Sequence, residues 1–140
     1  MVTISSLIRP ETRHLIGIAQ LYRAQRWWPA APDHLDIVAR IVAGSHCFIV
    51  AEAEGAVIGM GRAISDGVSD AYIQDVTVIP DHRRRGIGTR IVSAILDRLT
   101  ADGLDWIGLI AEGGSAPLYH HLGFSPMAGG VAMRRTAGSP

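Results

Sequence analysis

The sequence of 140 residues contains no lysine and no asparagine, so arginine supplies all thirteen of its basic side chains. The missing lysine excludes a P-loop, whose phosphate-binding sequence ends in Gly-Lys-Ser or Gly-Lys-Thr. It also excludes enzymes that form a Schiff base on a lysine amine and hydrolases that use a Ser–Lys pair. Cys47 is the one cysteine, which excludes an internal disulfide and a structural zinc site built on several thiolates.

Net charge and long apolar runs are missing as well. Thirteen acidic residues balance the thirteen arginines, whereas general nucleic-acid binding relies on a basic face, so we expect no nucleic-acid partner. The chain shows no apolar run long enough to span a membrane and no signal peptide, so we expect a cytoplasmic protein without a membrane partner. Its length predicts a single domain over residues 1–140.

Apolar periodicity predicts an α/β (α+β) chain with the element order β-α-α-β-β-β-α-β-α-β. A mixed sheet follows, antiparallel in its first part, with a parallel crossover through one long helix. We expect Asp33 to be the N-cap of the second helix. The expected strands span 2–8, 46–52, 56–64, 69–79, 105–111 and 131–135, and the expected helices open at Pro10 and Pro32 and span 86–100 and 115–122.

An arginine-rich loop follows the strand that ends at Pro80, and Gly86 and Gly88 then open the long helix. Free N–H groups and the dipole of a first helical turn attract anions, and glycines let a phosphate approach the backbone closely. This arrangement is typical of a pyrophosphate site. The other interpretation is a helix that begins with glycines beside a solvated basic loop. A dinucleotide-binding G-x-G-x-x-G motif is incomplete, because Ile91 stands at its third glycine.

As a whole, this segment resembles the signature of the GNAT superfamily of acetyl-CoA-dependent N-acetyltransferases, V-x-P-x-x-[RQ]-x-x-G-x-[GA]. Val78, Pro80, Arg83, Gly86 and Gly88 match every defined position. A second family element, an aromatic residue in a short helix followed by Gly-Phe, is matched further along by Tyr119, Gly123 and Phe124. The resemblance covers nearly the whole chain.

The chain departs from the family pattern at two positions. Many members have glycine where Arg84 stands, and many have a cofactor-contacting asparagine where Gly113 stands. Neither position defines the motif.

The resemblance implies a GNAT-like, mostly antiparallel central sheet flanked by helices, and a homodimer. It implies direct acetyl transfer from acetyl-CoA to a primary amine of a small molecule or peptide. The backbone of Val76, Thr77 and Val78 would bind the pantetheine arm, and the N–H of Val76 or a neighbour would polarise the thioester carbonyl. The pyrophosphate would be held by the amides of Arg83, Arg84, Arg85, Gly86, Ile87, Gly88 and Thr89.

The resemblance places Tyr119 near the CoA sulfur, as the general acid that protonates the departing thiolate. The alternative is an aromatic ring that only packs the short helix.

Asp75 is the candidate general base, because many members place an acid at this point of the strand. Strand alternation puts Ile73 and Thr77 on its side of the sheet. The alternatives are a structural acid that accepts hydrogen bonds from nearby backbone, or a base that is instead water, His120 or His121. His82 is close enough in sequence to the loop to reach a phosphate.

Trp27 and Trp28 lie between the first two helices, a region that commonly covers the acceptor site in the family. They are candidates for substrate binding, and the alternative is that at least one belongs to the core. Arg62, Asp66 and Asp70 are weaker candidates for contact with the amine. We expect no metal site, and the competing function is a non-catalytic sensor that binds acetyl-CoA on the same fold.

Overall fold

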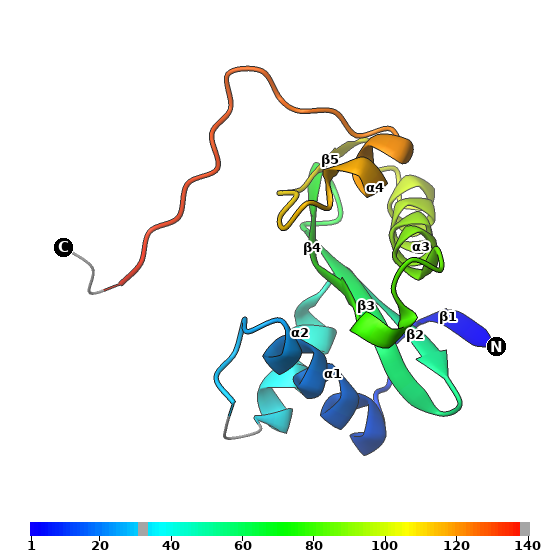
Figure 1. The fold of residues 1–140 in the computed structure, drawn as a ribbon. Helices are drawn as coiled ribbons and strands as arrows, with labels where there is room; N and C mark the ends of the chain where they lie inside the picture. Colours follow the sequence, from blue (N-terminus) through cyan, green and yellow to red (C-terminus); the bar gives the residue numbers. More distant parts are fainter. Residues whose placement is uncertain (31–33, 138–140) are drawn as a thin grey trace. The chain divides into compact units, whose positions relative to one another are not determined.

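In the computed structural model, residues 1–30 and 34–137 are described, and the chain divides into two units, Met1–Leu109 and Ile110–Pro140. The first unit is built on one sheet of five strands that lie side by side in chain order (Figure 1). Its strands are β1 (Val2–Ser6), β2 (Cys47–Ala53), β3 (Ala56–Ser65), β4 (Asp70–Val78) and β5 (Trp106–Gly108).

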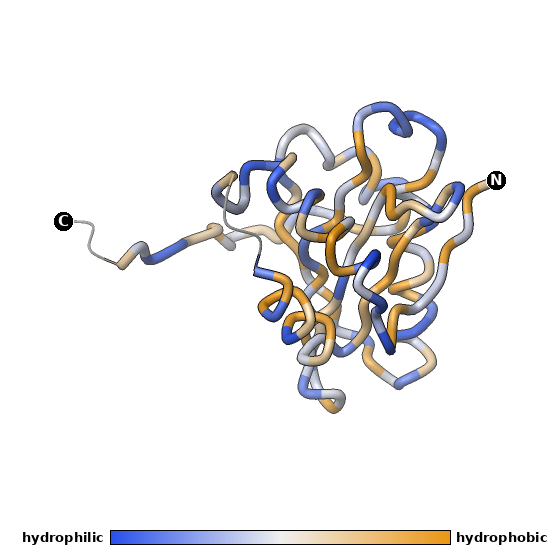
Figure 2. The backbone as a smooth tube through the Cα atoms, turned by 90° about the horizontal axis from the view of Figure 1, so that it is seen from below, coloured by the Kyte–Doolittle hydropathy of each residue, from blue (hydrophilic) through white to orange (hydrophobic). Residues whose placement is uncertain are grey.

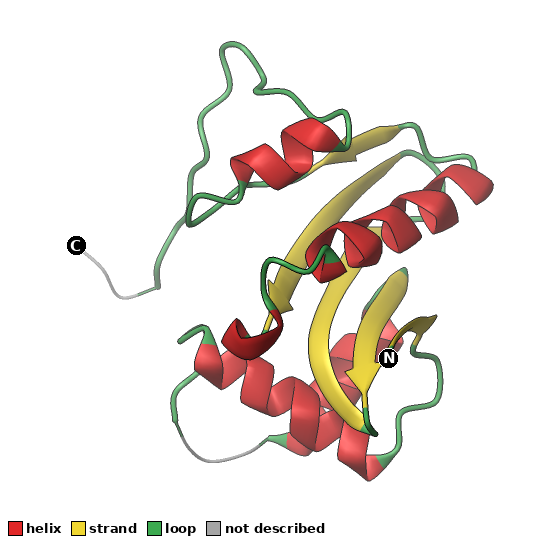
Figure 3. Cartoon of the chain, turned by 45° about the vertical axis from the view of Figure 1, so that its right-hand side comes forward, coloured by secondary structure: helices red, strands yellow, loops and turns green. Residues whose placement is uncertain are grey.

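The strand directions confirm the expected mixed, mostly antiparallel sheet. The pairs β1–β2, β2–β3 and β3–β4 are antiparallel, and β4–β5 is parallel. A parallel pair requires a crossover, and the long helix α3 (Ile87–Ala101) supplies it after a short 3-10 turn, η1 (Pro80–His82) (Figure 3).

Two helices, α1 (Thr12–Ala24) and α2 (Leu35–Gly44), cover one face of the sheet. Their apolar residues form a core with strand residues of that face, which include Phe48, Val50 and Met60. Along the backbone tube of Figure 2, hydrophobic and hydrophilic residues alternate in short segments, as amphipathic elements require. The N-cap of α2 is His34, and the expected N-cap, Asp33, lies outside the described residues.

The opposite face of the sheet carries α3, which lies unusually close to β3. A Cβ atom built on Gly61 would lie 2.9 Å from Ile91 Cγ2 and 3.1 Å from Ile95 Cδ1. A Cβ on Gly59 would lie 3.0 Å from Ile91 Cδ1. Alternate glycines on β3 therefore let two isoleucines of α3 pack directly on the backbone of the sheet.

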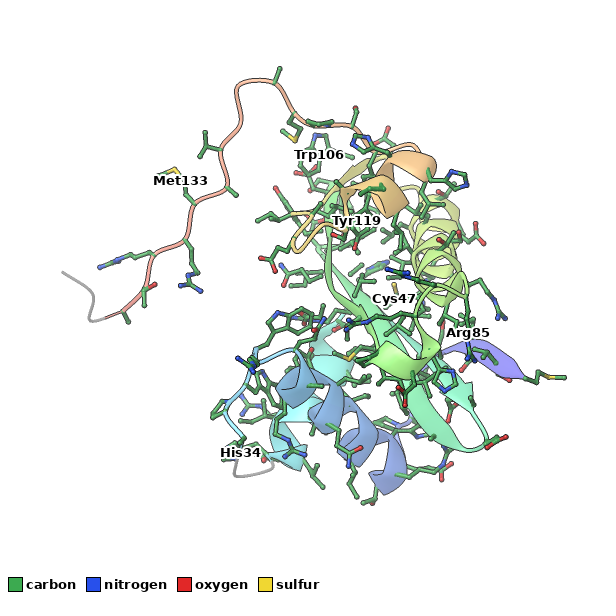
Figure 4. The ribbon with its side chains drawn as sticks, viewed as in Figure 1. His34, Cys47, Arg85, Trp106, Tyr119 and Met133 are labelled. Atoms are coloured by element: carbon green, nitrogen blue, oxygen red, sulfur yellow. The ribbon has the colours of Figure 1, made fainter. Side chains whose placement is uncertain are left out.

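The second unit contains α4 (Ala116–His121), close to the bounds that the sequence predicts. The expected strand over residues 131–135 is wrong: this segment has no strand pairing, and Val131 and Met133 are 82% and 89% exposed. Figure 4 shows Met133 on an extended stretch of chain. Alternating apolar residues mark a face that a strand would bury, but they cannot supply the partner strand that satisfies its backbone. That both units form the single domain expected over residues 1–140 stays a prediction.

Candidate active site

The arginine-rich loop connects β4 to α3 through two residues with left-handed backbone. Arg84 has a φ of +62° and Gly86, the N-cap of α3, has a φ of +75°. Glycine adopts this conformation without strain, whereas arginine does so at a cost of about 1–2 kcal/mol. A glycine at position 84 would adopt this backbone conformation without that cost.

The loop leaves a row of backbone donors without protein acceptors. The Arg90 N–H donates to the Gly86 carbonyl at 3.1 Å, which closes the first turn of α3. In the described part of the chain, the N–H groups of residues 84–89 make no hydrogen bond. Free amides at the positive end of a helix dipole attract anions, and that this loop binds a pyrophosphate stays a prediction.

The arginine side chains of the loop are exposed, but they are not equivalent. Arg83 Nε donates to the Val78 carbonyl at 2.8 Å, so its guanidinium is tied to the end of β4. Arg84 and Arg85 extend into solvent, and Figure 4 labels Arg85 on this loop. His82, half-buried beside them, has a buried Nδ1 atom without a partner among the described residues.

The edge of β4 that faces β5 is open over the second half of the strand. β5 pairs only with Asp70, Ala71 and Tyr72, and no strand in the described chain pairs with residues 73–78 on that edge. The Ile79 N–H donates to the Ile58 carbonyl in β3. Since successive N–H groups of a strand point in opposite directions, the Val78 N–H faces the open edge.

A bulge interrupts β4 beside this open edge. Met60 pairs with Thr77 and Arg62 pairs with Gln74, so Asp75 and Val76 together lie opposite Gly61. Asp75 has a φ of +59°. A bulge of this kind bends the strand and changes which side chains share a face.

The bulge makes one expectation about Asp75 wrong. Ile73 pairs with Ala63, which pairs with Cys47 on the α3 face, whereas Asp75 faces α1. The extra residue breaks the strict alternation on which the expectation depended. Thr77 does share the side of Asp75, because its Oγ1 accepts a hydrogen bond from Gln25 Nε2, at the end of α1, at 2.7 Å.

The partners of Asp75 are side chains from two other elements. Its Oδ2 atom accepts hydrogen bonds from the Tyr22 hydroxyl on α1 and from Arg62 Nε on β3, each at 2.7 Å. Arg62 Nη1 in turn donates to Ser45 Oγ, at the C-cap of α2, at 3.4 Å. Among the described residues, no nearby backbone group donates to this carboxylate, which was the structural alternative. The carboxylate is held between α1 and β3.

Tyr22 lies inside an aromatic cluster with the two candidate tryptophans. Its ring stacks on Trp28 at 4.2 Å and 5° and lies 6.0 Å from the ring of Trp27 at 60°. Burial raises the pKa of the Tyr22 phenol, and the negative charge of Asp75 raises it further. Trp28 packs against the core while Trp27 is 40% exposed, so Trp27 is the one that presents a free ring surface.

Helix capping places Trp27 beside Tyr22. The Trp27 N–H donates to the Tyr22 carbonyl and the Arg26 N–H to the Arg23 carbonyl. Arg26 has a φ of +60°. This is a Schellman motif, in which a left-handed residue follows the helix and an apolar pair closes over it.

The same motif ends α4 in the second unit. The Phe124 N–H donates to the Tyr119 carbonyl and the Gly123 N–H to the His120 carbonyl, and Gly123 has a φ of +94°. The rings of Tyr119 and Phe124 meet edge to face at 5.8 Å and 82°. The family's Gly-Phe element is therefore the cap of this helix, and burial raises the pKa of Tyr119. His120 and His121 are exposed.

Two of the weaker candidates have other partners. Asp66 accepts hydrogen bonds from the Val68 and Ser69 N–H groups at 2.8 Å each, and these bonds lower its pKa. The Asp70 carbonyl accepts a hydrogen bond from the Ser65 hydroxyl in the same turn. Both residues therefore shape the β3–β4 turn.

Residues 1–30 and 34–137 contain no group of histidine, cysteine and acidic residues that would hold a metal ion.

Sequence reasoning missed Tyr22 and Gln25 as site residues. Tyr22 falls within the first predicted helix, and nothing local in the sequence connects it to Asp75, 53 residues away. The available signal was chemical, since a tyrosine at a core position brings a hydroxyl that requires a partner.

No helix in the described chain is long and apolar enough to cross a membrane.

The chain resembles known proteins in its sequence. The model of the acetyltransferase (GNAT) family matches residues 4–124. The chain is 35% identical over 74 residues to the uncharacterized N-acetyltransferase ycf52 of Gracilaria tenuistipitata var. liui, covering 53% of this chain and 41% of that protein. The matched part of the chain thus spans less than half of that relative.

Two solved structures share the fold. A GNAT-family acetyltransferase of Streptococcus pneumoniae superposes with a TM-score of 0.75 at 23% identity, covering 97% of this chain and 100% of that one. A Clostridium acetobutylicum protein described as a predicted acetyltransferase, solved with acetyl-CoA, has a TM-score of 0.74 at 16% identity, covering 96% of each chain.

Proposed function

Because the chain belongs to the acetyltransferase (GNAT) family, we propose that it transfers the acetyl group of acetyl-CoA to a primary amine. The observation that carries the proposal is the continuity of two sets of free backbone groups. The open edge of β4 ends at Val78, and the unpaired amides of residues 84–89 begin a few residues later. One ligand with an amide-bearing arm and a pyrophosphate would use both.

The residues of the loop fit the phosphate end of this ligand. A Cβ on Gly86 would meet nothing within 4 Å, so the space over the loop is open to a phosphate group. Arg84 and Arg85 supply permanent charge around it. In this proposal Val76, Thr77 and Val78 bind the pantetheine arm along the strand edge, and the Val76 N–H or a neighbouring one polarises the thioester carbonyl.

The acceptor amine must lose a proton before or during attack. A primary amine with a pKa of about 10.4 is mostly protonated at pH 7, and deprotonating it costs roughly 4–5 kcal/mol. Asp75 is the proposed base, receiving the proton directly or through water. The neutral amine nitrogen bonds to the thioester carbon, the C–S bond breaks, and the thiolate takes a proton from the Tyr119 hydroxyl. The acetylated nitrogen gives up its second proton through water, which restores the Tyr119 phenol, and Asp75 releases its proton to solvent.

The acceptor is proposed to be a small molecule or a peptide N-terminus, with Trp27 and Trp28 lining its site. The exposed ring of Trp27, two residues beyond the C-cap of α1, supports this assignment. A cytoplasmic homodimer is proposed from the family resemblance, and light scattering of the purified protein measures the assembly.

Calorimetry with acetyl-CoA tests the site. The wild-type chain is expected to bind one molecule per chain, and Gly86→Asp is expected to weaken binding at least about 100-fold because it places a carboxylate against phosphate. Gly86→Asn adds a side chain of the same size without the charge. Gly103→Asp is the matched control, since Gly103 also has a positive φ and open space, at the other end of α3.

If Gly86→Asp binds as tightly as Gly103→Asp, the loop assignment is wrong. Thiol release over a panel of polyamines, aminosugars and peptide N-termini then separates an enzyme from a sensor. Acetyl-CoA binding without turnover on any of these amines favours the non-catalytic sensor.

A further inference from the structure

The Asp75 carboxylate is held asymmetrically. Both of its side-chain donors, the Tyr22 hydroxyl and Arg62 Nε, bind the same oxygen, Oδ2, at 2.7 Å. In the described part of the chain, no residue donates a hydrogen bond to Oδ1. One oxygen is thus occupied by the protein, and the other remains able to accept.

Both donors are themselves fixed by their surroundings. The Tyr22 side chain is buried, with 3% of the residue exposed, and its ring stacks on Trp28 at 4.2 Å. The Arg62 side chain is 17% exposed, and its Nη1 reaches Ser45 Oγ. A donor with few available rotamers positions its acceptor more narrowly than a mobile surface side chain does.

The backbone beneath Asp75 gives a further reason for these contacts. Asp75 is a bulge residue with a φ of +59°, a conformation that costs an L-residue free energy and that its surroundings must maintain. The bulge turns its side chain toward α1, where Tyr22 and Arg62 meet it from two elements. Backbone strain and two directed hydrogen bonds therefore define one orientation of the carboxylate.

We infer that Tyr22 and Arg62 are positioning residues, which hold the Asp75 carboxylate through Oδ2 so that Oδ1 takes the proton of the acceptor amine. In this step the N–H bond of the attacking amine breaks and an O–H bond forms on Oδ1, directly or through one water. This inference rests on the proposed acetyl transfer with Asp75 as base. Neither Tyr22 nor Arg62 exchanges a proton with the substrate.

A double-mutant cycle on turnover tests the inference, with acetyl-CoA and the amine that wild type acetylates fastest. Tyr22→Phe keeps the ring and its stack on Trp28 but removes the hydroxyl. We expect kcat to fall about 10-fold, because a misplaced catalytic group costs up to about 100-fold, while the KM for acetyl-CoA stays within about twofold. In an Asp75→Asn background, the same substitution is expected to have no further effect on kcat.

Matched controls separate positioning from general packing. Tyr72→Phe removes the hydroxyl of an exposed β4 tyrosine that touches Trp106 instead of Asp75. Arg98→Gln breaks an Arg–Asp pair of similar geometry, at 2.8 Å, on α3. Both controls are expected to leave kcat within about twofold, whereas Arg62→Gln lowers it and Arg62→Lys restores part of it, because lysine keeps a charged donor.

The outcomes distinguish the two proposals. An equal loss from Tyr22→Phe in both backgrounds means that Tyr22 acts through packing, and the inference is overturned while acetyl transfer stands. Full turnover in Asp75→Asn removes Asp75 as base and the positioning roles with it. No acetyl transfer by wild type on any amine rejects the proposed function itself. If Tyr22→Phe does not fold, the same cycle with Arg62→Gln and Asp75→Asn decides.

Discussion

The helices α1 and α4 end in the same capping motif, but the tyrosines at the two caps have different partners. α1 and α4 both close in a Schellman motif with a tyrosine at the carbonyl that accepts the long-range hydrogen bond, Tyr22 in one and Tyr119 in the other. In both, an aromatic residue after the left-handed position packs on that tyrosine, Trp27 in α1 and Phe124 in α4. The cap therefore places a phenol at the end of each helix in the same local geometry.

The two ends differ in the left-handed residue and in the hydroxyl. α4 uses Gly123, whereas α1 uses Arg26. The same capping geometry therefore presents two phenols. The Tyr22 hydroxyl binds Asp75, whereas the Tyr119 hydroxyl has no hydrogen-bond partner among the described residues of its own unit.

The largest expected effect is on catalysis, in which the two tyrosines are expected to differ. Tyr119→Phe is expected to lower kcat about 100-fold, since general acid catalysis contributes about 10²–10⁴, and to leave the acetyl-CoA dissociation constant unchanged. Steady-state kinetics and calorimetry on the same preparation measure the two quantities. The loss should exceed the one from Tyr22→Phe, and turnover equal to wild type would reduce Tyr119 to a packing residue.

The second expected effect concerns stability and reverses the order of the two tyrosines. At pH 7, Tyr22→Phe is expected to lower the free energy of unfolding by about 1–2 kcal/mol, because it removes a hydrogen bond to a carboxylate. Tyr119→Phe is expected to change it by less than about 0.5 kcal/mol. Urea denaturation of both variants measures the difference, and equal losses would contradict it.

The stability difference between wild type and Tyr22→Phe is expected to depend on pH. The pKa of Tyr22 is raised in the folded chain above its ordinary value of 10.0. The protonated Tyr22 hydroxyl therefore contributes fully to the free energy of unfolding below about pH 10. This contribution is lost as the pH rises through the pKa of Tyr22 in the folded chain. The stability gap between wild type and Tyr22→Phe should narrow above pH 10, and a gap that widens there would contradict the assigned direction.

The smallest expected effect comes from substituting the two residues with left-handed backbone, Gly123 and Arg26. Gly123→Ala is expected to destabilise its cap by about 1 kcal/mol, because alanine at positive φ is strained. Arg26→Gly relieves the same strain but adds backbone entropy to the unfolded chain, so we expect a gain of only about 0.5 kcal/mol. Hydrogen exchange of the Phe124 and Trp27 amides, which close the two caps, measures both.

Ala24→Gly, in the same helix as Arg26, is the control for Arg26→Gly. Ala24 occupies the last turn of α1, where glycine has only an entropic cost, so Ala24→Gly should speed exchange of the Trp27 amide by about fivefold for about 1 kcal/mol. If Arg26→Gly also speeds exchange, Arg26 contributes a stabilising contact that outweighs its strained backbone.

Much of the fold could be predicted because its signals are local. The glycines and arginines between Pro80 and Arg90 define a strand–loop–helix junction wherever the rest of the chain lies. Helical and alternating patterns located nine elements, with ends displaced by a few residues. The strand expected over residues 131–135 failed, since its pattern is local but its formation requires a partner strand.

The site was less predictable because its contacts are distant in sequence. The family resemblance made Asp75 a candidate, but its partners Tyr22 and Arg62 reach it across 53 and 13 residues. Strand alternation assigned Ile73 to the wrong side because it takes no account of a bulge. A bulge depends on the register between two strands, which neither strand determines alone.

The sequence by itself determined the order of nine elements, the strand–loop–helix junction with its two glycines, and the exclusion of lysine chemistry. These follow from backbone conformation, periodicity and composition, which act over a few residues. Only the tertiary structure decided which oxygen of Asp75 is occupied and by which donors. The physical reason is that the orientation of this carboxylate depends on contacts among α1, β3 and the bulge of β4, which are distant in sequence. The bulge lies opposite Gly61. The absence of a Cβ atom at Gly61 lets α3 pack closely against the other face of the sheet.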